Sequence, residues 1–218
     1  MPSTLVHLAV GALVAAALLS WAYDARSLAV VLAVTALPDL DAILGIWVLG
    51  GHRALLHTLL LPLALAALLW WDIRGRETSW LRSRWGAKGA RTAGVAVVAL
   101  AVAGIGPDLV TNGVNVFYPL HDQFYKVDGH ALLSTHDGFV QTFVDLSPPT
   151  TDSGGGSTVV GDPVGSTNDT HYETGVDPVR GDESGPVERE FPLVNSGMQL
   201  LLVVLGTGVA AGRLLEER

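Results

Sequence analysis

The sequence predicts an all-α fold, a polytopic transmembrane helix bundle of about five spans with a long acidic loop. The composition supports this prediction, because the 218-residue chain is 49% hydrophobic and has a mean hydropathy of +0.40. Ordinary soluble domains are less apolar. The chain also contains several apolar runs close to the roughly 20 residues that a helix needs to cross a bilayer.

Five apolar runs are candidates for these spans, at residues 5–21, 27–50, 54–71, 92–109 and 193–212. The second run is interrupted by Pro38-Asp39-Leu40-Asp41. Proline lacks a backbone donor and disfavours helical geometry in the residue before it. We therefore expect the second span to be broken or re-entrant, with an extended or turned segment that brings both carboxylates to one side.

The basic residues predict the orientation of the bundle. The segment 72–91 holds six of the 13 Lys and Arg residues, so the positive-inside rule places it in the cytoplasm. Alternation of the spans then puts the N-terminus and the 110–192 loop outside, and the C-terminus inside. The sequence divides accordingly into a membrane-embedded core at 1–140, a loop at 141–192 and a C-terminal span with a short tail at 193–218.

The loop is acidic and of low complexity. Residues 122–190 carry 13 acidic side chains against three basic ones, within a chain of net charge −8. Segment 141–192 is rich in Gly, Ser, Thr, Pro and Asp, a composition that predicts disorder. The acidic coat suggests a halophilic archaeon, and no basic stripe for nucleic acid is present. The absence of cysteine excludes disulfides and thiolate metal sites.

Several polar side chains stand where lipid penalises them. A carboxylate at bilayer depth costs roughly 2.5–3.5 kcal/mol, so such groups are expected to pair, to bind a cation or to act chemically. The predicted orientation places all of them at or near the outer side. They are His7, Asp39, Asp41, His52, Arg53, His57 and Asp108.

Imidazole and carboxylate groups without thiolate suit a divalent metal, Zn²⁺ first, with Mn²⁺ or Fe²⁺ as alternatives. A catalytic zinc ion commonly has three protein ligands and one bound water, whose pKa falls to about 7. Arg53 can balance carboxylates or bind a phosphate group through two nitrogens.

Four segments in order resemble the LexA-regulated, membrane-bound metal-dependent hydrolases, a YdjM-like family described as distantly similar to zinc-dependent phospholipase C. The segments are His7, LPDLDAI at 37–43, GHRALLHT at 51–58 and DLVTNGVNVFYPL at 108–120. The family usually has a histidine four residues before its late aspartate, where this chain has Gly104. That departure leaves three alternatives: a single metal, a ligand supplied by His121 or His136, or a protein that is no longer catalytic.

The resemblance and the residues together predict a membrane-bound hydrolase of phosphate esters, acting on lipid or lipid-linked substrates at the outer interface. His7, Asp39, His57 and Asp108 are the expected metal ligands. Asp41 or His52 is expected to serve as a further ligand or general base, and Arg53 to stabilise the phosphate oxyanion. The lipid bilayer is the expected partner. The alternatives are a non-catalytic scaffold and a cation-binding or transport-related protein, both retaining the cluster.

Overall fold

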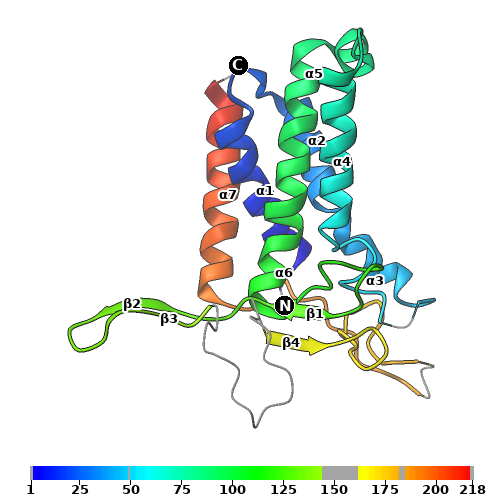
Figure 1. The fold of residues 1–218 in the computed structure, drawn as a ribbon, viewed down its shortest axis with the longest axis vertical. Coiled ribbons are helices and arrows are strands. Elements are labelled where there is room, and N and C mark those ends of the chain that lie inside the picture. The colour runs from blue at the N-terminus through cyan, green and yellow to red at the C-terminus, as the bar shows by residue number, and fades with distance from the viewer. Residues whose placement is uncertain (1, 49, 144–161, 182–184, 217–218) are drawn as a thin grey trace.

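The computed structural model describes residues 2–48, 50–143, 162–181 and 185–216. Its helices run side by side, and the strands and longer loops collect at one end of them (Figure 1). The helix α1 covers Thr4–Leu18, and a short 3-10 turn at Ser20–Ala22 leads into α2, Ala25–Thr35. Apolar side chains of α1, α2 and the later helix α5 form the main core, which includes Ala15, Leu19, Tyr23, Leu28, Val31 and Ala99.

The second predicted span is bent, as its proline suggested. After α2 the chain forms a 3-10 turn, Pro38–Leu40, and a short helix α3, Asp41–Leu44, at 43° to α2. Of the two geometries expected here, the turned one is confirmed and the extended one is wrong, because Leu37 has helical dihedral angles (φ −56°, ψ −42°). Pro38 opens the new helical turn, a position where its missing N–H breaks no intrahelical hydrogen bond.

The helices formed by the third and fourth apolar runs do not begin at the expected residues. Helix α4 covers Leu60–Trp70 rather than starting at residue 54, and it continues into a π-helical turn, Trp71–Gly75. The predicted cytoplasmic loop is largely helical from residue 80: α5 covers Trp80–Ala99 with a kink at Gly86 (φ +70°). A π-helical turn, Leu100–Ile105, and α6, Gly106–Thr111, follow. The Ser79 side chain accepts a hydrogen bond from the Arg82 N–H and so caps the N-terminus of α5. A serine at this position is a local signal for the start of a helix, but the basic residues around it were interpreted as a loop.

Fewer than five of the described helices are long enough to cross a membrane. Among the described residues, Trp80–Thr111 and Gly197–Glu216 are long and apolar enough, and the bent α2–α3 pair makes a third. Helix α1 has 15 residues and α4 has 11. The structure therefore supports two or three membrane spans and does not show five, and the inside–outside orientation stays a prediction.

The chain also contains strands, which the all-α prediction did not include. Strand β1, Phe124–Lys126, pairs with β4, Asp162–Gly165, while β2, Ala131–Ser134, and β3, Gly138–Gln141, form a hairpin. The prediction of disorder is thus wrong for part of the 141–192 loop, because β1 and hydrogen bonds from Thr167 to Asp122 anchor it. Residues 144–161 and 182–184 of the predicted disordered loop lie outside the described residues.

The last helix, α7 at Gly197–Glu216, packs closely along α1 (Figure 1). A Cβ atom on Gly206 would lie 2.4 Å from the carbonyl oxygen of Ala9, whereas a Cβ atom on Gly208 would meet nothing within 4 Å. The absence of a side chain at position 206 therefore sets how near α7 approaches the helix that carries His7.

Substituting Gly206→Ala should lower the thermal midpoint of the purified protein, because overpacking costs about 1–3 kcal/mol. The matched Gly208→Ala variant should leave the midpoint unchanged or raise it, since alanine favours helix more than glycine does. Equal midpoints for the two variants would show that α7 does not pack on α1 in this way.

Candidate metal centre

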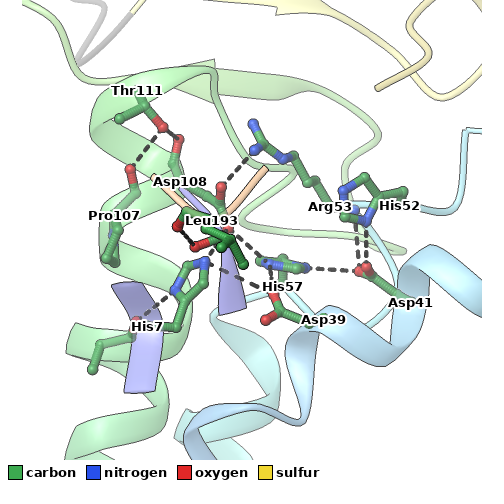
Figure 2. Close-up of polar contacts among 12 residues, drawn as sticks. His7, Asp39, Asp41, His52, Arg53, His57, Pro107, Asp108, Thr111 and Leu193 are labelled. Atoms are coloured by element: carbon green, nitrogen blue, oxygen red, sulfur yellow. Dashed lines mark hydrogen bonds and ion pairs between the residues drawn. The ribbon is translucent and has the colours of Figure 1, made fainter. Parts of the chain in front are cut away.

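The seven polar residues singled out in the sequence meet at the end of the bundle where the loops collect (Figure 2). Helix α1 supplies His7, the α2–α3 bend supplies Asp39 and Asp41, and α6 supplies Asp108. The remaining three lie in turns at 51–57, so His57 precedes α4 instead of lying on it. All except Asp39 are buried: His7, Asp41, His52, Arg53, His57 and Asp108.

Two imidazoles have their tautomers set by their neighbours. The Nδ1 atom of His7 lies 2.7 Å from the Ala103 carbonyl oxygen, and Nδ1 of His57 lies 2.8 Å from Oδ2 of Asp41. Both partners only accept hydrogen bonds, so each Nδ1 carries the proton and donates it. In a neutral ring the Nε2 atom is then a free lone pair, which is the form in which histidine binds metal.

Both Nε2 atoms face the same two carboxylates. From His7 Nε2 the distance is 3.3 Å to Oδ2 of Asp108 and 3.8 Å to Oδ1 of Asp39. From His57 Nε2 the corresponding distances are 3.0 Å and 3.9 Å. Lone pairs of nitrogen and oxygen repel one another at these distances unless a proton or a cation lies between them.

The spacing of these atoms suits a metal ion. Ligand atoms of His7, Asp39 and Asp108 all lie within 4.8 Å of one another, so this group could hold a metal. Ligands at about 2.0–2.2 Å from one zinc ion are themselves about 3.4 Å apart in a tetrahedron. Among the described residues, His7 Nε2 and Asp39 Oδ2 have no hydrogen-bond partner, although both atoms are buried. The identity of the metal does not follow from this geometry.

Asp41 lies behind His57, away from Asp39. Its Oδ1 accepts from Nδ1 of His52 at 2.7 Å, and its Oδ2 accepts from His57 and from the backbone N–H groups of Arg53 and Leu56. The expectation that Asp39 and Asp41 face one side is therefore wrong, because the helical bend directs them to opposite nitrogens of His57 (Figure 2). The lone pairs of Asp41 are occupied by these donors.

Arg53 is held in an unusual backbone conformation. Its φ is +63°, in the left-handed region that non-glycine residues seldom adopt. Its N–H donates to Asp41, and its carbonyl accepts from the Asn115 N–H at 2.9 Å. The side chain is only 1% exposed and places Nη2 2.6 Å from Oδ1 of Asp108. Its Nε and Nη1 have no hydrogen-bond partner among the described residues.

Tyr172 from the acidic loop covers this arginine, a contact that the sequence did not reveal. The Arg53 Cζ atom lies 4.6 Å from the centre of the Tyr172 ring, a cation–π contact. Burial raises the pKa of Tyr172, so its hydroxyl stays neutral and donates to the Asn112 carbonyl oxygen at 2.8 Å. A tyrosine in a polar, low-complexity stretch carries no local signal of this role.

Asn115 is the second contributor that sequence reasoning missed. It is fully buried, and its side chain donates to Asp122 at 2.6 Å. Asp122 also accepts two hydrogen bonds from Thr167, so this network ties the acidic loop to the turn that carries Arg53. The motif DLVTNGVNVFYPL already contained Asn115, and a buried amide could have been suspected there.

Neither alternative histidine replaces the one absent at position 104. His121 and His136 are exposed, and His121 contacts the Tyr125 hydroxyl instead. A Cβ atom on Gly104 would lie 2.8 Å from the Thr35 carbonyl oxygen and 3.2 Å from Cγ of Pro38. The α2–α3 bend thus occupies the space in which a histidine at 104 would have to fit. The roles assigned to the seven residues as ligands or catalytic groups stay predictions.

Comparison with known proteins identifies the family. The family model described as YdjM inner membrane protein matches residues 1–154, which include every residue of the cluster. This is a membrane-bound family associated with metal-dependent hydrolases. No curated protein and no solved structure shows significant similarity to the chain. The match covers more than two thirds of the sequence, and the chain therefore belongs to the YdjM inner membrane protein family.

Proposed function

We propose that this protein is a metal-dependent hydrolase of phosphate esters in lipid or lipid-linked substrates, with one divalent cation, Zn²⁺ first. The observation that carries the proposal is the convergence of two imidazole Nε2 atoms on Asp39 and Asp108. Family membership supports it. His7, Asp39, His57 and Asp108 would hold the ion.

The formal charge of the cluster supports a divalent ion. If the imidazoles are neutral, as metal-bound histidines are, the three carboxylates face one guanidinium, and two negative charges are left for the ion to balance. Uncompensated buried charge is strongly unfavourable, and a single divalent cation removes it. A bound Zn²⁺ would polarise the phosphate group and lower the pKa of its water to about 7.

The other residues of the cluster would act without binding the ion themselves. Asp41 would fix the ring of His57 through Nδ1, as carboxylates behind metal-bound histidines commonly do. The free Nε and Nη1 donors of Arg53 would bind phosphate oxygens and stabilise their growing charge. His52 is the remaining candidate base, because Asp41 already accepts hydrogen bonds from four donors.

The surroundings of Asp39 favour an amphiphilic substrate. Its side chain is 20% exposed, the most accessible carboxylate of the cluster, and it lies between Leu37 and Leu40, which are 40% and 49% exposed. A phosphate headgroup could reach Asp39 while its apolar chain stays against the leucines and the bilayer.

Gly104 favours a second candidate, a non-catalytic scaffold that retains the cluster. The space for the family's additional histidine is filled by the α2–α3 bend, so the set of ligands is smaller than the family pattern. A transport role has less support, because the described core beyond the cluster is mostly apolar, as at Leu19, Leu28 and Val31, and its buried polar groups are uncharged hydroxyls such as Ser27 and Thr92.

Metal content tests the proposal directly. The purified protein should contain about one equivalent of a divalent transition metal by elemental analysis, and His7→Ala or His57→Ala should lose most of it. His121→Ala, an exposed histidine outside the cluster, is the matched control and should retain it. A metal-free wild type that also takes up no Zn²⁺ or Mn²⁺ on dialysis would contradict the proposal.

Asp41→Asn should weaken Zn²⁺ binding by about 10- to 100-fold, the usual effect of removing a carboxylate behind a metal-bound histidine. Competition with a chelating dye measures this, and the exposed Asp137→Asn variant is the control. Unchanged affinity, in a variant with the wild-type thermal midpoint, would remove Asp41 from the site.

Activity separates the hydrolase from the scaffold. Protein reconstituted with Zn²⁺ or Mn²⁺ should release water-soluble phosphate from phospholipid vesicles, and Arg53→Lys should lower kcat by at least about 100-fold while metal content stays unchanged. The scaffold predicts that the metal binds and that no phosphodiester, in vesicles or in water, is cleaved.

A further inference from the structure

A concave feature lies between α4 and α5. The ends of these two helices that carry it lie away from the strands (Figure 1). It has a volume of about 280 Å³ and is lined by apolar side chains of both helices, among them Leu69, Trp70, Ile73 and Val97. Arg74 is the charged member of this lining. We name this feature the α4–α5 groove.

Gly94 keeps the groove open. A Cβ atom at position 94 would have only Leu69 Cδ2 near it, at 3.9 Å, so the absent side chain leaves a trough along α5. On the other wall, the π-helical turn Trp71–Gly75 places Ile73 and Arg74 beside Trp70. The α4–α5 groove is therefore lined mainly by apolar side chains, with the guanidinium of Arg74 as its charged group.

Among the described residues, some of the basic side chains around the groove are paired with carboxylates, but Arg74 is not. Residues 72–91 hold six of the chain's 13 Lys and Arg residues. Asp72 accepts hydrogen bonds from Ser79 and from two backbone N–H groups of α5, and it pairs with Arg76 at 3.6 Å. Arg74 is exposed, and within the described part of the chain no carboxylate pairs with it.

Tryptophans mark the depth of this end in the membrane. All six tryptophans of the chain are more than half exposed, and four of them lie near the groove: Trp70, Trp71, Trp80 and Trp85. Exposed tryptophans of membrane proteins gather at the level of the lipid headgroups. Arg74 therefore lies where a lipid phosphate would be, and the apolar trough runs from it toward the hydrocarbon core.

We propose that the α4–α5 groove is a binding site for an anionic phospholipid, with its phosphate on Arg74 and one acyl chain in the trough beside Gly94. Charge complementarity selects the headgroup, because basic pockets between membrane helices attract anionic lipids. The site is separate from the His/Asp cluster and does not depend on the function proposed for it.

Native mass spectrometry of the full-length protein, in detergent with equal amounts of phosphatidylglycerol and phosphatidylcholine, tests this proposal. The wild type should retain phosphatidylglycerol with about fivefold preference, the effect expected of one basic side chain near a membrane surface. Arg74→Gln should abolish the preference, whereas the paired Arg76→Gln should keep it. Gly94→Leu should reduce retention of both lipids, and Ala67→Leu, exposed on α4 outside the lining, should not.

Equal retention of the two lipids by the wild type would overturn the proposal. So would an equal loss of preference in Arg74→Gln and Arg76→Gln, since this outcome indicates a diffuse basic surface. The thermal midpoint, measured on the same samples, shows whether the variants are folded.

Discussion

Two buried carboxylates, a third that is partly exposed and one buried guanidinium meet at the end of an apolar bundle, and with neutral imidazoles their formal charges do not cancel. Unpaired charge in such surroundings is costly, so the local structure has to neutralise it. Hydrogen bonds stabilise the charge of Asp41, because this carboxylate accepts from two imidazoles and two backbone N–H groups. The other two carboxylates, Asp39 and Asp108, face the Nε2 atoms of His7 and His57.

The backbone around the cluster follows from this constraint. The bend after α2 lets Asp39 and Asp41 contact opposite nitrogens of His57, which a straight helix could not do at a spacing of two residues. The left-handed conformation of Arg53 costs about 1–3 kcal/mol and persists because its N–H and carbonyl are both engaged. Gly104 admits the bend, because a Cβ atom at that position would lie 2.8 Å from the Thr35 carbonyl oxygen.

The sequence predicted the residues of the cluster better than the elements that carry them. Lipid penalises buried Asp and His so strongly that their positions alone singled out His7, Asp39 and Asp108. Helix bounds were harder, because apolar composition does not separate the turns at 51–57 from α4, and basic residues concealed the start of α5 at Trp80. The contact of Tyr172 with Arg53 depends on strand pairing between β1 and β4, a long-range interaction with no local pattern.

One cation shared by imidazoles from α1 and from the turn before α4 is the central claim, and X-ray absorption at the metal edge tests it most directly. The account predicts a first shell of nitrogen and oxygen at about 2.0–2.2 Å, with the outer-shell scattering of two imidazoles. His7→Ala should reduce that scattering to one imidazole, and His57→Ala should do the same. A shell of oxygen alone, or a spectrum that neither substitution changes, would contradict the claim.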